Sequence, residues 1–189
     1  MDIMSETSAA ALSLVVDEIV EAARGVDPAE LDAVADAIAG AERVFVLGQG
    51  RSGIALKAFA MRLMHLGLET HVVGETTSPA VREGDALVVA SGSGTTETVV
   101  RGARKAAELG VTVIAITAEA DSPLSQTAHV VLRVRAAVKT DHGSAASQQY
   151  AGSLFEQTVL LVGDAVFQAL WQRSGTAAED LWPRHANLE

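Results

Sequence analysis

Between residues 43 and 134, short runs of apolar, largely β-branched residues alternate with longer stretches in which apolar residues recur at helical spacing. The five short runs are residues 43–48, 70–74, 86–91, 111–117 and 129–134. Such runs are typical of strands that are covered on both faces, as in parallel sheets. Because the helices between parallel strands cross over in a right-handed sense, they cover both faces of the sheet. The alternation predicts an α/β fold, with a five-stranded parallel sheet in a flavodoxin-like or Rossmann-like three-layer sandwich.

Two helices are expected before this sheet. In the first, apolar residues recur at helical spacing from Leu12 to Ala23. The second begins at Asp27 and Pro28, because aspartate is a favourable cap and proline a favourable first residue of a helix. We interpret residues 1–40 as N-terminal helices.

A long apolar helix is expected after the sheet. Residues 135–151 lack periodicity and predict an irregular loop, and long loops of this kind are often functional. Residues 153–173 are apolar on nearly every side, and a helix buried all round needs more cover than a small sheet provides. We therefore expect this helix to lie at a subunit interface, followed by a polar tail at residues 176–189. The 189 residues then form one domain, with an α/β core at 43–134 and the C-terminal helix and tail at 152–189.

The composition excludes several classes of function. The formal net charge is -10, which argues against nucleic acid as a partner because a phosphate backbone needs a basic surface. The chain has no cysteine, which excludes disulfides, thiol catalysis and zinc–thiolate sites. Its first residues show no pattern of a secretory signal, and no apolar run reaches the roughly 20 residues that span a bilayer. We therefore expect a cytoplasmic protein that does not enter a membrane.

Two strand-to-helix turns carry the residues that indicate a function. The first is Gly-Gln-Gly-Arg-Ser-Gly at residues 48–53, and the second is Ser-Gly-Ser-Gly-Thr-Thr at residues 91–96. Both follow expected strands, so they lie at the edge where open α/β sheets bind ligands. Glycine lets the backbone approach an anion, the helix start supplies free N–H groups, and hydroxyls add uncharged donors. The turns predict a phosphate site lined by Gly50, Ser52, Ser91, Ser93, Thr95 and Thr96.

Two other interpretations of these turns are open. Residues 48–53 match G-x-G-x-x-G, a pattern of dinucleotide sites, with Glu75 as a ribose acceptor. Such a site does not require a run of hydroxyls on the neighbouring turn, so the second turn favours a single phosphate. Serine and threonine are also ordinary helix caps, although the four hydroxyls of residues 91–96 exceed the need of one cap.

Several segments together resemble one known family. They are the two turns, FAMRLMHLG at residues 59–67, GET at 74–76, GSLFEQ at 152–157 and RHANLE at 184–189. In combination they resemble the 6-phospho-3-hexuloisomerases of the sugar isomerase (SIS) domain family, over nearly the whole chain. The resemblance implies interconversion of 3-hexulose 6-phosphate and fructose 6-phosphate, in the ribulose monophosphate pathway of formaldehyde fixation. It also implies a homotetramer that uses no metal and no organic cofactor.

The resemblance further implies roles for three residues. An enediol reaction needs a base that moves a proton between adjacent carbons, and Glu156 matches the family's candidate. His185, which alone would be an exposed histidine of a polar tail, is implied in ring opening or in proton transfer between oxygens. It would reach the site of a neighbouring subunit, so the active sites would lie at subunit interfaces. Arg51 matches a basic residue that related isomerases place near the substrate, and no pair of histidines has the spacing of metal ligands.

Departures from the family's pattern leave other functions open. Thr95 stands where several relatives carry glutamate, and Tyr150 and Ala151 stand where relatives tend to have proline. An arabinose-5-phosphate-type aldose–ketose isomerase shares the SIS fold, and a non-catalytic sugar-phosphate regulator is a third interpretation. Ser153 and Glu156 also form the S-x-x-E pattern of a helix capping box, in which the carboxylate would be structural.

Overall fold

Five parallel strands form one sheet in the order β2-β1-β3-β4-β5. They are β1 (Val44–Gly48), β2 (Thr70–Val72), β3 (Ala86–Ala90), β4 (Thr112–Thr117) and β5 (Val130–Arg133). The computed structural model describes residues 7–136 and 147–188, so residues 137–146 of the expected loop lie outside the described residues. The strand order is that of flavodoxin-like sheets, and the predicted α/β fold is confirmed.

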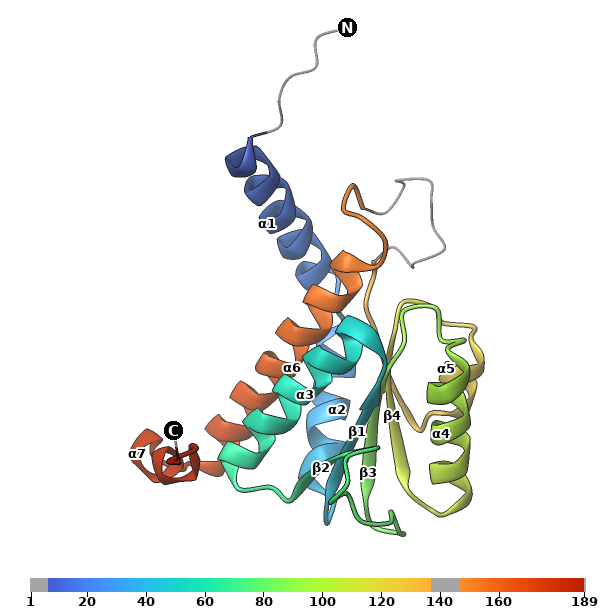
Figure 1. Ribbon diagram of the computed structural model, residues 1–189, viewed down its shortest axis with the longest axis vertical. Helices are drawn as coiled ribbons and strands as arrows, with labels where there is room; N and C mark the ends of the chain where they lie inside the picture. The colour runs from blue at the N-terminus through green and yellow to red at the C-terminus, as the bar shows by residue number, and fades with distance from the viewer. Residues whose placement is uncertain (1–6, 137–146, 189) are drawn as a thin grey trace, which may run out of the picture.

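Helices cover both faces of the sheet, as Figure 1 shows. One face carries α2 (Pro28–Ala39), α3 (Gly50–Leu66) and α6 (Ser153–Ser174), and the other carries α4 (Glu97–Glu108) and α5 (Pro123–Thr127). The first helix, α1 (Ser8–Arg24), packs against α6 and projects beyond the sheet (Figure 1). The expected tail is partly helical, because α7 (Ala178–Leu181) and the 3-10 turn η1 (Trp182–Arg184) follow α6.

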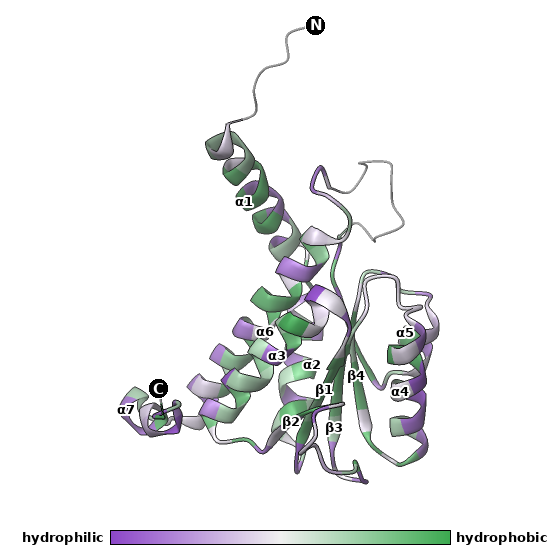
Figure 2. Ribbon diagram, viewed as in Figure 1, coloured by the Kyte–Doolittle hydropathy of each residue, from purple (hydrophilic) through white to green (hydrophobic). Residues whose placement is uncertain are grey.

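Two separate cores hold these layers together. Phe59 and Phe167 are buried between the sheet and the helices α2, α3 and α6. Val99 and Leu124 are buried between the sheet and the helices α4 and α5. Every residue of β3 is buried, which explains its unbroken apolar sequence. Figure 2 shows the strands as largely hydrophobic and α4 as hydrophobic on one side only.

The long helix α6 is covered mainly within its own subunit. It packs against α1, α2 and α3, and this cover accounts for much of the apolar character from which we expected a subunit interface. Leu160 and Leu161 on its outer side keep exposed fractions of 41% and 40%. Within the described residues, neither α6 nor any other helix has the length and apolar character needed to cross a bilayer.

The helix α1 carries an apolar stripe that the described residues do not bury. Leu12, Val16 and Val20 lie four residues apart and keep exposed fractions of 64%, 48% and 40%. Only Ala22, near the end of the helix, is buried. Residues four apart lie on one side of a helix, so the stripe is a continuous apolar surface.

The turn between β1 and α3 depends on a close approach of two glycines. A Cβ atom on Gly53 would lie 2.6 Å from the carbonyl oxygen of Gly48, closer than side chains approach a backbone. Helix α3 therefore packs directly on the end of β1, and it begins at Gly50, inside the glycine-rich turn. This packing accounts for the outer two glycines of the G-x-G-x-x-G pattern without a dinucleotide.

Replacement of Gly53 by alanine is expected to lower the free energy of unfolding by about 1–3 kcal/mol, because the methyl group forces α3 away from β1. Gly40→Ala is the matched control, since Gly40 has a φ of -84° and a Cβ there would contact Asp36 O at an ordinary 3.5 Å. That control is expected to stabilise slightly, by about 0.4–1 kcal/mol. Urea unfolding measures both, and equal stabilities of the two variants would contradict the close-approach argument.

Candidate active site

Three helix N-termini meet at the carboxyl edge of the sheet. Strands β1 and β3 are neighbours, with Gly48 opposite Ala90, so the two glycine-rich turns that follow them lie side by side. The start of α6 joins them, because a Cβ on Gly92 would lie 3.3 Å from the ring of Phe155. Figure 1 shows the first turns of α3 and α6 together at this edge. Helix N-termini present free N–H groups and a positive dipole end, so this convergence suits an anion.

The hydroxyls of the serine-rich turn bond to one another rather than to the helix that follows. Ser91 Oγ lies 2.8 Å from Thr96 Oγ1, and Ser93 Oγ lies 2.9 Å from Thr95 Oγ1. Thr96 is the N-cap residue of α4, and no side-chain hydrogen bond caps this helix in the described structure. The capping interpretation of the turn therefore lacks support, and its hydroxyls bond in pairs instead.

The predicted residues of the first turn occupy the start of α3. Gly50 is its first residue, with a φ of 56°, and Ser52 is buried. Arg51 projects outward, and its side chain keeps 57% of its exposure. The N-cap residue Gln49 makes no side-chain capping bond, so this helix start is also open to an anion.

Arg51 is bound to the first turn of α6. Its Nη1 donates to Ser153 Oγ over 2.9 Å and lies 3.1 Å from Glu156 Oε2. The side chain of Glu156 is 6% exposed, so one partner of this ion pair is buried and the other faces solvent. A cavity of about 270 Å³ opens beside the pair, lined by Arg51, Glu156, Gln157, Ile54, Ala55, Ala58 and Leu160.

The S-x-x-E pattern does not form the capping box that its sequence allows. Gly152, not Ser153, is the N-cap residue of α6, and Ser153 Oγ donates to Tyr150 O over 2.8 Å. The pattern instead places a hydroxyl and a carboxylate on the guanidinium of Arg51. Arg51 and Glu156 were expected in the site, whereas the contact of Ser153 with Arg51 was not, although Ser153 belongs to the same S-x-x-E pattern as Glu156.

The structure places His185 at the opposite end of α3 and α6 from these residues. Its ring stacks on His65 with centroids 3.9 Å apart, and Trp182 packs on its other side at 4.9 Å. Arg184 anchors the tail by donating to His65 O at the end of α3, over 3.1 Å. Arg51 and His65 are about 21 Å apart along α3, at about 1.5 Å of rise per residue. His185 therefore does not join Arg51 and Glu156 within one subunit.

The stacked histidine pair is partly buried. His65 is 6% exposed, and its Nδ1 has no hydrogen-bond partner within the described structure. Burial lowers the pKa of His65, and the charges of His185 and Arg62 lower it further. The folded protein thus favours the neutral ring of His65. This contribution to stability is fully present at pH values above the ordinary histidine pKa, and it is lost as the pH falls through the lowered value. No group of three metal-ligating side chains occurs in residues 7–136 and 147–188.

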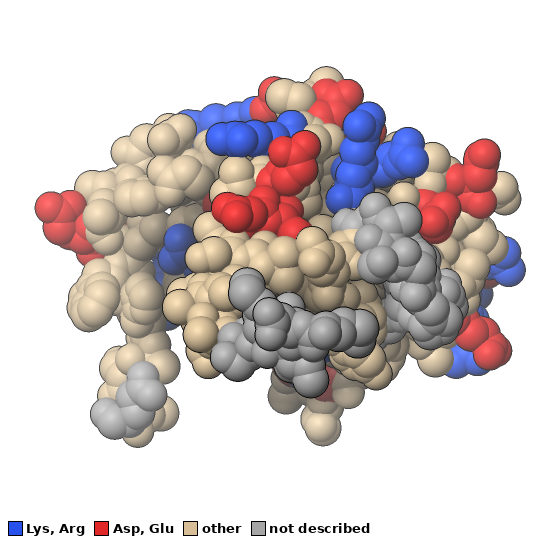
Figure 3. Space-filling view, turned by 90° about the horizontal axis from the view of Figure 1, so that it is seen from above, with Lys and Arg blue, Asp and Glu red and all other residues tan. Residues whose placement is uncertain are grey.

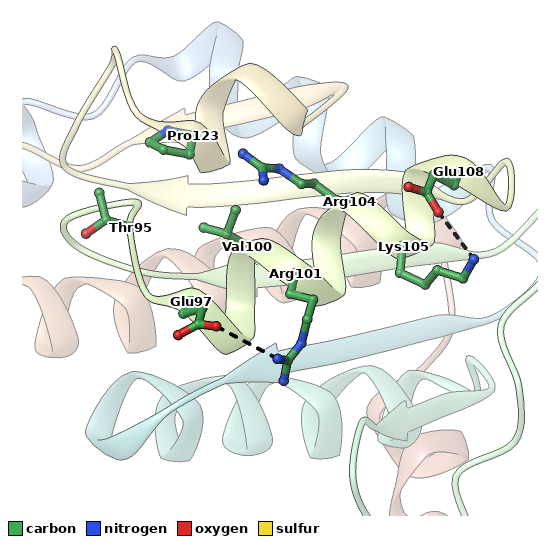
Figure 4. A pocket seen from close by; sticks show the side chains of 8 residues that line it. All are labelled: Thr95, Glu97, Val100, Arg101, Arg104, Lys105, Glu108 and Pro123. Carbon is green, nitrogen blue, oxygen red and sulfur yellow. Dashed lines mark hydrogen bonds and ion pairs between the residues drawn. The ribbon is translucent and has the colours of Figure 1, made fainter.

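A second cavity, of about 520 Å³, lies along α4 beside the start of α5, and its lining includes basic and acidic residues of α4, Thr95 and Pro123. Figure 4 shows that Arg101 and Lys105 each face a glutamate of their own helix, at 3.9 Å from Glu97 and 3.2 Å from Glu108. All four side chains are largely exposed, so this is a solvated helix surface with paired charges. The candidate active site is therefore the edge where α3, α4 and α6 begin.

Comparison with known proteins finds similar chains that carry one enzyme name. The 3-hexulose-6-phosphate isomerase of Mycobacterium gastri is 54% identical over 94% of this chain and 89% of its own length. The enzyme of the same name from Bacillus subtilis is 39% identical over 93% of this chain and 95% of its own. Among solved structures, a protein of Methanococcus jannaschii for which a 3-hexulose-6-phosphate isomerase function is inferred has a TM-score of 0.78. It shares 32% identity and covers 95% of this chain and 99% of its own.

The glycine-rich turns and the start of α6 fall within the region that defines the family. The model of the SIS domain matches residues 37–161, which include β1 to β5 and the N-terminal part of α6. With relatives this similar over nearly its whole length, the chain belongs to the SIS domain family.

Proposed function

We propose that the protein is a 3-hexulose-6-phosphate isomerase, which interconverts 3-hexulose 6-phosphate and fructose 6-phosphate through an enediol. The observation that carries the proposal is the match of nearly the whole chain to relatives of that name. The site geometry supports it, because an anion site and a buried carboxylate lie at the same sheet edge.

The phosphate group would bind at the serine-rich turn. Ser91, Ser93 and Thr96 would donate their hydroxyls, and Thr95 would do so from the exposed side of the turn. Gly50 and Ser52 would bring the start of α3 to the same anion. Uncharged donors and helix dipoles bind a phosphate without a basic surface, which reconciles this substrate with the acidic chain.

The proton transfer would belong to Glu156. Its carboxylate would take the proton from C2 of the 3-ketose to form the 2,3-enediolate, and return it to C3 to give the 2-ketose. Burial of this side chain keeps water away from the proton it carries. Arg51, 3.1 Å from the carboxylate and open to solvent, would turn toward the enediolate oxygens and stabilise their charge. These steps need neither a metal nor an organic cofactor.

The site would be completed by a second subunit. His185 would shuttle the proton between the two substrate oxygens, and its stacking on His65, which lies about 21 Å along α3 from Arg51, supports delivery to a neighbour's site. The exposed stripe of Leu12, Val16 and Val20 offers an apolar surface for association. We propose a homotetramer of single SIS-domain subunits with active sites at their interfaces.

The proposed setting is the cytoplasm, with a sugar phosphate as the partner and neither nucleic acid nor a membrane. Basic and acidic side chains are intermixed on the face seen from above in Figure 3, which supports the absence of a nucleic-acid surface.

The direct test of the proposed reaction is turnover of 3-hexulose 6-phosphate to fructose 6-phosphate, with arabinose 5-phosphate as a competing substrate. Preference for arabinose 5-phosphate would replace the proposed reaction, and binding of either without turnover would favour a regulator.

Glu156→Gln is expected to lower kcat by about 10²–10⁴, because the amide keeps the shape but cannot accept a proton. Binding of inorganic phosphate, measured by calorimetry, should be unchanged, since the serine-rich turn is intact. Glu97→Gln makes the same change at an exposed helix start and should keep the parent kcat. Near-parent turnover by Glu156→Gln would assign its carboxylate a purely structural role.

Variants of Glu156 and His185 should complement each other in mixed oligomers. Glu156→Gln and His185→Asn are each expected to be nearly inactive alone. Refolded together in equal amounts, they should recover about a quarter of the parent activity. With random assembly, about a quarter of the sites combine an intact Glu156 from one chain with an intact His185 from its neighbour. If His185 instead acts within its own chain, the mixture will show only the sum of the two residual activities.

A further inference from the structure

A carboxylate on α1 binds the segment that leads into α6. Glu18 Oε2 accepts from Ser147 Oγ at 2.6 Å and from Gln149 Nε2 at 3.0 Å, and Oε1 accepts from the backbone N–H of Gln148 at 2.7 Å. One half-buried side chain thus binds three consecutive residues that lie about 130 positions further along the chain.

These hydrogen bonds are charge-assisted. Burial raises the pKa of Glu18, but the bonds from Ser147, Gln148 and Gln149 outweigh that effect and hold the pKa below its ordinary value. The carboxylate is therefore ionised at neutral pH. Hydrogen bonds to an ionised acceptor are about twice as strong as neutral ones, so this contact fixes the segment more firmly than neutral polar contacts would.

The segment that Glu18 holds continues directly into the candidate site. Gln157 Nε2 in the first turns of α6 donates to Gln149 Oε1 over 2.9 Å. Tyr150 O accepts a hydrogen bond from Ser153 Oγ, and that same hydroxyl accepts one from Arg51 Nη1. A short chain of hydrogen bonds therefore joins α1 to the helix turn that carries Glu156.

The backbone of this segment needs such support. Ala151, directly before the N-cap residue of α6, has a φ of 52°, the single non-glycine residue with positive φ among the described residues. A left-handed conformation costs a residue with a Cβ about 1–2 kcal/mol. Strained conformations of this kind persist only where surrounding contacts hold them, and they occur most often beside functional sites.

We propose that Glu18 is a positioning residue for the reaction. Its carboxylate fixes residues 147–149 on α1, and through Gln149 and Gln157 it sets the first turn of α6, where Ser153 and Glu156 meet Arg51. The effect on turnover rests on the proposed isomerase function, whereas the effect on the segment does not. Because α1 also exposes Leu12 and Val16, the same helix joins a surface for association to the geometry of the site.

Glu18→Gln tests the proposal, because the amide keeps the size but removes the charge, and its single NH2 group must face either the N–H of Gln148 or the Nε2 of Gln149, so one of these donors loses its acceptor. Asp17→Asn is the matched control, since it removes the same charge from the preceding exposed residue of α1. In Glu18→Gln, kcat is expected to fall about tenfold while KM changes less than about twofold, since the phosphate turn is untouched. Asp17→Asn should retain both parent values.

Hydrogen exchange without substrate provides the second measurement. The amide of Gln148 should exchange faster in Glu18→Gln than in the parent, with no such change in Asp17→Asn. In a double-mutant cycle on kcat, the losses caused by Glu18→Gln and by Gln149→Ala should not add up in the double variant, because both substitutions break the same hydrogen-bond network. Parent kcat in a folded Glu18→Gln, or additive losses in the cycle, would overturn the proposal. If the parent itself does not turn over the substrate, the proposed function fails and exchange at Gln148 alone decides whether Glu18 holds the segment.

Discussion

The packing of α6 along α3 is the contact on which the rest of the molecule depends. A Cβ on Gly163 of α6 would lie 3.1 Å from the side chain of Phe59, so the two helices approach closely because this position has no side chain. At one end, this approach brings Ser153 and Glu156 to Arg51. At the other end, it leaves the last turn of α3 open for the C-terminal tail. One helix pair thus sets the geometry of two functional regions that are far apart.

The sheet and its two ligand turns were predictable from the sequence because burial determines them. Strand β3 is buried on both faces, and this burial requires the unbroken run of apolar residues from which the strand was predicted. The turn at residues 91–96 remains a predicted ligand site, whose hydroxyls outnumber the needs of a cap and, among the described residues, make no capping bond to α4. The start of α3 at Gly50 was less predictable, since it depends on the close approach of Gly53 to Gly48 in three dimensions.

The surroundings of Glu156 could not be predicted from the sequence, because they depend on residues far apart in it. The S-x-x-E pattern specifies a capping box only if Ser153 is the N-cap residue. The positive φ of Ala151 and the capping position of Gly152 shift the helix start by one residue, so the serine turns to Arg51 instead. A proline at position 151 could not adopt this φ, because its ring fixes φ near -65°.

The docking of the tail follows from elementary electrostatics at the end of α3. Carbonyl groups at a helix C-terminus carry partial negative charge, and Arg184 binds the last turn by donating to His65 O. That bond holds His185 on His65, at the opposite end of the helix from Arg51. The proposed reaction, which uses both ends of α3, would therefore need two copies of the chain. The exposed apolar stripe of α1 would supply a surface for such an association, on the same helix that carries Glu18.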